Sequence, residues 1–253
     1  MPPISVLIKP SSGMCNMKCD YCFYCDEMKK RMRESYGFMT EQTLKNVIRK
    51  TMFHAEGMIS YAYQGGEPTL RGIAFYEKAM EYQRHYNKCG IRVNNAMQTN
   101  GYLIDDEWCK FFRENHFLIG LSVDGTKQIH DLYRHGRRGE PTFDRIKKAA
   151  ELMDQYGVDY NILTVVTQKT AGHAAEIYNY YKEQGWKYQQ YIACLDPLGE
   201  DRGKTPYALN PEQYGMFLTE LFNLWYEDWK KGEQPYIRPV SYTHLRAHET
   251  DQY

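Results

Sequence analysis

The sequence lacks a long uncharged apolar run, an excess of charge of one sign and a second group of closely spaced cysteines. No stretch approaches the roughly 18 apolar residues that span a bilayer, and the start of the chain has no positively charged region like that of a secretory signal. Lysine and arginine number 32, as do aspartate and glutamate, so no overall charge attracts nucleic acid or an anionic membrane. We therefore expect a cytoplasmic protein that binds neither nucleic acid nor membrane.

Three of the seven cysteines, Cys15, Cys19 and Cys22, fall within eight residues directly after an apolar run. Disulfides are not expected, because the cysteine count is odd and a chain of this length can bury its own core. Three thiolates on one loop can hold three irons of a 4Fe–4S cluster and leave the fourth iron without a protein ligand. An open metal position is where a substrate or cofactor binds. The spacing therefore predicts a cluster with one open iron.

Two other kinds of metal site use clustered cysteines. A structural zinc ion normally needs four ligands in two separated pairs, and Cys89, Cys109 and Cys194 are isolated. Cys25 is the more serious alternative, since a fourth thiolate would close the cluster and make an electron carrier of the ferredoxin type. Bacterial ferredoxin spacing differs, and a proline usually follows it. We expect Cys25 to be dispensable for cluster assembly.

Short β-like runs alternate with helical patterns, which predicts βα units and a parallel sheet. Six units are too few for a closed eight-stranded barrel, so the predicted fold is α/β, a partial (βα)6 TIM-like barrel. In such barrels the active residues project from the C-terminal ends of the strands. We expect a core domain over residues 1–238 and an unassigned tail over 239–253. The expected strands are residues 4–8, 58–64, 91–98, 117–123, 158–166 and 187–193.

Helical spacing and helix-end residues support this alternation. Asn210 and Pro211 fit the cap and first position of the last long helix. Its apolar stripe, which we expect to pack against the sheet, comprises Leu218, Leu221, Phe222, Trp225 and Trp229. Three earlier helices are indicated by Leu44, Val47, Ile48 and Thr51, by Tyr76, Ala79, Met80 and Gln83, and by Ile146, Ala149, Ala150 and Met153. Glycines expected to end helices are Gly57, Gly90, Gly157, Gly185 and Gly232.

Polar residues and glycines follow the expected strands. After the second strand, Gly65 and Gly66 allow the backbone to approach a ligand closely, and Glu67 follows them. Gln98 and Asp124 stand at the ends of the third and fourth strands, although ordinary turns would explain Asn100-Gly101 or Asp124-Gly125 taken singly.

Arg134 lies in a segment rich in charge, where a solvated cluster is the simplest interpretation. A guanidinium also binds carboxylates bidentately, so an arginine on this face can hold the carboxylate of a cofactor.

The cysteine spacing, with Tyr21 just before the third cysteine, resembles the signature of the radical S-adenosylmethionine (radical SAM) enzymes. The segment from Gly65 to Pro68 resembles their Gly-Gly-Glu-Pro motif. The resemblance implies the partial barrel of the radical SAM type. It also implies that S-adenosylmethionine (SAM) chelates the open iron and is cleaved to a 5'-deoxyadenosyl radical, chemistry that such cofactors carry.

Further motifs resemble the anaerobic sulfatase-maturating enzymes, and the likeness runs from Met1 to about Arg238. It implies oxidation of a cysteine or serine in a sulfatase polypeptide to Cα-formylglycine, with an electron donor such as flavodoxin or ferredoxin. The motifs include Pro2-Pro3, Tyr21-Cys22-Phe23-Tyr24, Ser35-Tyr36-Gly37, Leu195-Asp196-Pro197-Leu198 and Leu224-Trp225-Tyr226-Glu227-Asp228.

The resemblance also implies roles for single residues. Cys15, Cys19 and Cys22 are the expected cluster ligands. Direct contacts to SAM are implied for Tyr21, Gly66, Ser122, Arg134 and Leu195, and the strand-end residues Gly65, Glu67, Gln98 and Asp124 complete the expected cofactor site.

One departure from the family is large. Its members continue into a cysteine-rich region with two auxiliary clusters and an aspartate proposed as the general base, whereas residues 239–253 match no part of it. We therefore expect one cluster, no identifiable catalytic base, and impaired conversion of a sulfatase peptide. A peptide maturase that forms thioether or other crosslinks is the alternative enzyme, and the electron carrier is the alternative without catalysis.

Overall fold

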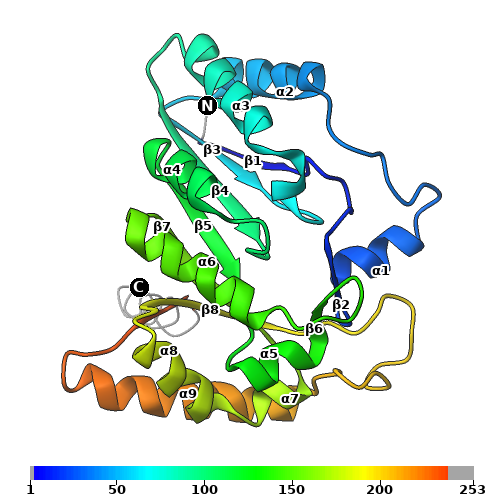
Figure 1. The fold of residues 1–253 in the computed structure, drawn as a ribbon, viewed down its shortest axis with the longest axis vertical. Helices are drawn as coiled ribbons and strands as arrows, with labels where there is room; N and C mark the ends of the chain where they lie inside the picture. Colours follow the sequence, from blue (N-terminus) through cyan, green and yellow to red (C-terminus); the bar gives the residue numbers. More distant parts are fainter. Residues whose placement is uncertain (1–2, 239–253) are drawn as a thin grey trace, which may run out of the picture. The chain divides into compact units, whose positions relative to one another are not determined.

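The structure is a computed structural model that describes residues 3–238, and helices and strands alternate along it (Figure 1). The six expected strands are all present, as β1 (Ile4–Ile8), β3 (Met58–Tyr63), β4 (Arg92–Thr99), β5 (Phe117–Ser122), β7 (Asp159–Val166) and β8 (Tyr188–Ala193). The main helices are α2 (Glu41–His54), α3 (Ile73–Tyr86), α4 (Asp106–Glu114), α6 (Phe143–Tyr156), α8 (Ala174–Glu183) and α9 (Pro211–Trp229). The tail expected over residues 239–253 lies outside the described part.

The strand order in the main sheet is β1-β3-β4-β5-β7-β8-β9. The registered pairs are parallel, from β1 with β3 to β8 with β9 (Tyr236–Ile237). Parallel neighbours need a crossover connection, and a helix lies between each consecutive pair of these strands in the chain. Six βα repeats therefore confirm the predicted α/β class.

The elements that were not predicted are short. Strand β9 has only two residues, too few for a sequence period. A second, two-stranded sheet joins β2 (Met17–Cys19) to β6 (Arg134–Gly136). The remaining elements are α1 (Phe23–Lys29), η1 (Pro68–Arg71), α5 (Lys127–Tyr133) and α7 (Gln168–Ala171).

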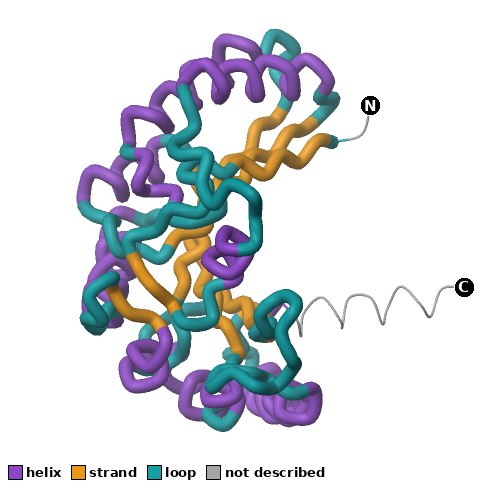
Figure 2. Tube along the Cα trace, turned by 90° about the vertical axis from the view of Figure 1, so that its right-hand side faces the viewer, coloured by secondary structure: helices purple, strands orange, loops and turns teal. Residues whose placement is uncertain are grey.

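The chain divides into two compact units. Unit 1 comprises residues 3–18, 24–121 and 145–160, and unit 2 comprises residues 19–23, 122–144 and 161–238. In unit 1, α2 and α3 lie side by side, and Figure 2 shows the helices of this unit along one side of its strands. In unit 2, α8 and α9 are neighbours in the same way.

In unit 1, the helix faces that the sequence predicted to point inward are buried in the structure. Leu44 and Ile48 of α2 are fully buried. From α3, Tyr76 is fully buried and its ring meets that of Tyr63 edge-on, with centroids 5.1 Å apart. The predicted face of α6, made of Ile146, Ala149, Ala150 and Met153, is buried throughout. All five glycines expected at helix ends have positive φ, at Gly57, Gly90, Gly157, Gly185 and Gly232.

The predicted stripe on α9 was partly wrong. The helix buries Phe217, Leu221 and Trp225, whereas Phe222 is 47% exposed and Trp229 is 48% exposed. The two exposed rings stack on Tyr226 instead, at interplanar angles of 11° and 12°. Aromatic residues occur on both faces of this helix, so spacing alone did not fix which face is buried. Within residues 3–238, no helix combines the length and apolar character that crossing a bilayer requires.

The start of α9 yields a stability test. Asn210 Oδ1 accepts a hydrogen bond from Gln213 N at 2.7 Å, and Gln213 Oε1 accepts one from Asn210 N at 3.2 Å. We expect Asn210→Ala to lower the free energy of unfolding by about 1 kcal/mol, because alanine cannot accept the hydrogen bond from Gln213 N. Urea denaturation measures the change, with Glu220→Ala on the exposed face of α9 as control. Equal midpoints for the two variants would contradict the capping role.

Candidate functional site

Cys15 belongs to unit 1, and its sulfur faces two nitrogen donors. Met17 N donates to Cys15 Sγ at 3.3 Å, and the Asn100 side-chain amide donates to the same sulfur at 3.5 Å. Asn100 also donates to Asn16 Oδ1 at 2.8 Å, which fixes the amide beside the thiol. Hydrogen bonds to a cysteine sulfur tune the reduction potential of a cluster bound to it. From the sequence, Asn100 was predicted only as part of a turn, because Cys15, its hydrogen-bond partner, lies 85 residues away.

Cys19 and Cys22 belong to unit 2, where the short segment between them is tied to the chain around β6. Cys22 N donates to Cys19 O at 3.2 Å, and Asp20 N donates to Tyr133 O at 3.0 Å. The Asp20 carboxylate also lies 3.1 Å from His135 Nε2. Main-chain bonds on both sides of Asp20 therefore hold the two cysteines in place.

None of the three thiols is buried: Cys15, Cys19 and Cys22 are all partly exposed, as cluster ligands must be before loading. Cys25, in α1, is also partly exposed. No three His, Cys, Asp or Glu side chains among residues 3–238 gather around one point as a single metal ion requires. In a 4Fe–4S cluster each thiolate binds a different iron, and the donor set of three thiols fits that group.

Gly65 and Gly66, which follow β3, lie so close to neighbouring residues that there is no room for a side chain. A Cβ on Gly66 would lie 2.2 Å from the carbonyl oxygen of Met14, and one on Gly65 would lie 2.8 Å from Lys9 Cγ. Glu67 N donates to the same Met14 carbonyl at 2.8 Å. The turn therefore packs directly against the residue before Cys15, a close approach of backbone to backbone that only glycine permits.

Glu67 is 1% exposed, and donors from within unit 1 surround its carboxylate. Oε1 accepts from Thr69 N at 3.0 Å, Thr69 Oγ1 at 2.6 Å and Thr99 Oγ1 at 2.7 Å. Oε2 accepts from Asn100 N at 2.8 Å. Burial raises the pKa of Glu67, while these hydrogen bonds oppose that rise. The side chain fastens the end of β4, with Asn100, to the turn after β3.

The other predicted residues of unit 1 and unit 2 lie at strand ends. The Gln98 amide occupies the space beside Gly120 of β5, where an added Cβ would lie 2.0 Å from its Oε1. Ser122 is the last residue of β5 and is half-buried. Leu195 follows β8 and is 63% exposed.

Tyr21, Asp124 and Arg134 are joined in unit 2. The phenol of Tyr21 donates to Asp124 Oδ2 and accepts from Arg134 Nη1, the latter at 2.9 Å. Arg134 is 6% exposed and Asp124 is 3% exposed, so the solvated interpretation of Arg134 was wrong. Burial raises the pKa of Tyr21, which keeps the phenolic proton in place. Burial also raises the pKa of Asp124, and the charge of Arg134 opposes that rise.

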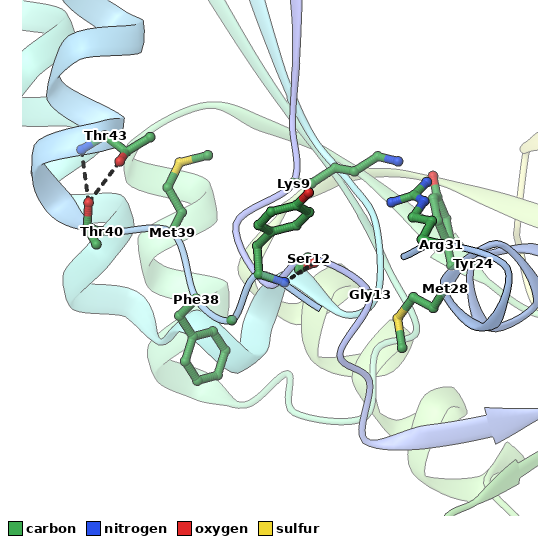
Figure 3. Close-up of a pocket in the computed structure, with 12 residues that line it drawn as sticks. Lys9, Ser12, Gly13, Tyr24, Met28, Arg31, Phe38, Met39, Thr40 and Thr43 are labelled. Carbon is green, nitrogen blue, oxygen red and sulfur yellow. Dashed lines mark hydrogen bonds between the residues drawn. The ribbon is translucent and has the colours of Figure 1, made fainter. Parts of the chain in front are cut away.

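A hollow of about 370 Å³ lies in unit 1 beside the chain that leaves β1 (Figure 3). Lys9 and Arg31 bring positive charge to it, and Tyr24 and Phe38 bring aromatic rings. Lys9 Nζ lies 4.9 Å from the centroid of the Tyr24 ring. Tyr24 Oη in turn accepts a hydrogen bond from Gln64 Nε2 at 2.8 Å. The hollow therefore adjoins the C-terminal ends of β1 and β3, where barrels carry their active residues.

Residues 10–181 match the radical SAM superfamily. The chain belongs to this superfamily. The radical SAM fold is thereby confirmed, and SAM and an iron–sulfur cluster are the cofactors of the family. The three thiols, the donors directed at the Cys15 sulfur and the buried Arg134 are the groups that we expect to hold them.

Two curated relatives resemble this radical SAM chain. A cysteine-type anaerobic sulfatase-maturating enzyme of Clostridium perfringens is 49% identical over 238 residues, which are 94% of this chain and 64% of the relative. A serine-type anaerobic sulfatase-maturating enzyme of Bacteroides thetaiotaomicron is 31% identical over 242 residues, covering 89% of this chain and 58% of the relative. The chain therefore spans less than two thirds of the length of these relatives.

A solved structure agrees with the sequence comparison. It is described as native anSMEcpe with bound AdoMet and Cp18Cys peptide, and it matches with a TM-score of 0.89 at 48% identity. The match covers 94% of this radical SAM chain and 63% of that one.

Glu67 gives a test of how the site is held together. We expect Glu67→Gln to destabilise the chain by roughly 2 kcal/mol, because the amide cannot accept all four hydrogen bonds and leaves a buried donor unpaired. Glu77→Gln, on the exposed face of α3, is the matched control. Urea denaturation of both variants measures the effect. A Glu67→Gln midpoint equal to that of the control would show that the four bonds do not stabilise the fold.

Proposed function

We propose that this chain is the radical SAM part of an anaerobic sulfatase-maturating enzyme, with residues 1–238 as its core domain. The observation that carries the proposal is the 49% identity to the Clostridium perfringens enzyme over 238 residues. Identity to the serine-type enzyme is lower, at 31%. We therefore infer that the target is a cysteine of a sulfatase polypeptide, which is oxidised to Cα-formylglycine.

The proposed cofactors are one 4Fe–4S cluster and SAM. Cys15, Cys19 and Cys22 would hold the cluster, and the fourth iron would take SAM. The residues proposed for the cofactor site remain Tyr21, Gly65, Gly66, Glu67, Gln98, Ser122, Asp124, Arg134 and Leu195. When bound, these cofactors supply the abstraction of a hydrogen atom from an unreactive carbon.

The overall reaction on cysteine removes two hydrogens and replaces sulfur with oxygen from water. The sulfur leaves as sulfide, and the Cβ becomes the aldehyde carbon. The protein must hold the polypeptide with this Cβ in a fixed place and keep it away from water until the oxidation is complete. No residue of the chain is assigned as the general base.

We place the polypeptide segment at the hollow beside Lys9. Its position at the ends of β1 and β3 supports this, as does its mixture of aromatic and cationic side chains, which suit apolar side chains and backbone carbonyls of a peptide. A flavodoxin or ferredoxin is the proposed electron donor. An odd count of seven cysteines fits a reducing compartment, so we propose a cytoplasmic location.

Two cysteine variants distinguish an open cluster from a closed one. We expect the anaerobically reconstituted chain to hold about four irons, and Cys25→Ala to retain them, because the cluster needs only three protein thiolates. Cys22→Ala should lose most of its iron. Iron and sulfide analysis of the two variants measures this. Loss of iron from Cys25→Ala to the same extent as from Cys22→Ala would favour the electron carrier.

Matched peptides that differ only in cysteine or serine at the target position test the substrate. We expect the cysteine peptide to stimulate 5'-deoxyadenosine formation several-fold more than the serine peptide. A Phe38→Ala chain should need a higher peptide concentration for half-maximal rate, since this ring lines the proposed peptide site. Mass spectrometry identifies the product. Equal stimulation of 5'-deoxyadenosine formation by the two peptides would contradict the cysteine assignment. A product lighter than the peptide by only two hydrogens would favour the crosslinking maturase.

A further inference from the structure

Each oxygen of the Asp124 carboxylate accepts a hydrogen bond within unit 2. Oδ1 accepts a hydrogen bond from Val165 N at 2.9 Å. Oδ2 accepts from the Tyr21 phenol and lies 4.0 Å from Arg134 Nη1. Asp124 is 3% exposed, so a carboxylate already bonded at both oxygens has little room left for a ligand.

A second set of hydrogen bonds, through His130 and Thr142, connects the main chain of Asp124 to that of Arg134. His130 is fully buried, and its ring lies between Asp124 N, at 3.2 Å from Nδ1, and Thr142 Oγ1, at 3.2 Å from Nε2. Thr142 Oγ1 donates to the carbonyl oxygen of Arg134 at 2.9 Å. Asp124 and Arg134 are therefore connected twice, through the Tyr21 phenol and through the His130–Thr142 pair.

Arg134, unlike Asp124, has a buried polar group that makes no hydrogen bond. Its Nε is buried and has no hydrogen-bond partner among the described residues. A buried, charged donor without a partner is costly, which points to an acceptor that arrives with a ligand.

We propose that Asp124 is a positioning residue and not a contact of SAM: through the Tyr21 phenol it aims the Arg134 guanidinium at the cofactor and fixes the segment between Cys19 and Cys22. This rests on the proposed function for the identity of the cofactor. Within unit 2, one phenol thereby connects the segment between Cys19 and Cys22 to the arginine expected to bind SAM.

The test is equilibrium binding of SAM to the reconstituted chain and to Tyr21→Phe, Asp124→Asn and the double variant. Tyr21→Phe keeps the ring, which meets Tyr133 and Tyr207 edge-on with centroids 6.4 Å apart in each case. We expect its iron content to be unchanged and its affinity for SAM to fall about tenfold, the loss of one charge-assisted hydrogen bond. Tyr133→Phe is the matched control, because its hydroxyl donates instead to Pro206 O at 2.8 Å.

The double variant separates positioning from direct contact. If Asp124 acts through Tyr21, the double variant binds SAM about as weakly as the weaker single variant, because both changes break one chain of interactions. If Asp124 binds SAM itself, the two losses multiply, and the proposal is overturned. An affinity of Tyr21→Phe within twofold of the control overturns it as well.

Two further measurements are the iron content of each variant and the SAM affinity of the unmodified chain. Should Tyr21→Phe lose iron, Asp124→Asn carries the test, and near-normal SAM affinity in that variant overturns the proposal. Failure of the unmodified chain to bind SAM would instead count against the proposed function, since the inference compares variants with that chain.

Discussion

A buried carboxylate must have donors for its oxygens, and two such groups organise the residues of the site. Glu67 is 1% exposed and Asp124 is 3% exposed, and both accept hydrogen bonds from segments distant in sequence. Desolvating either group without these donors would cost several kcal/mol. The loops that carry the predicted cofactor residues therefore keep the conformations that satisfy these two carboxylates.

Each carboxylate fixes a different part of the chain. In unit 1, Glu67 joins the Gly65-Gly66 turn to Asn100, whose amide in turn reaches Cys15. In unit 2, Asp124 joins the end of β5 to Tyr21 and hence to the segment of Cys19 and Cys22. Neither carboxylate has to touch the cofactor to matter for it, since each holds a segment next to cysteines that we propose as cluster ligands. The motifs at the strand ends are thus structural and functional at once.

Much of the fold could be predicted from the sequence because it is specified locally. The six strands, the buried face of α6 and the cap at Asn210 depend on spacing and on residue types within a few positions. The burial of Arg134 and the four hydrogen bonds accepted by Glu67 could not be predicted in this way, because they depend on partners many residues away. The same holds for α9, where aromatic residues on both faces left Phe217 and Phe222 equally plausible as core.

The central claim is that three thiolates leave one iron open for SAM. The most direct measurement is the EPR spectrum of the reduced, anaerobically reconstituted chain before and after addition of SAM. The account predicts that SAM changes the spectrum, because it coordinates the cluster, and that deoxyadenosine then accumulates. A fully loaded cluster whose spectrum SAM leaves unchanged would contradict the account.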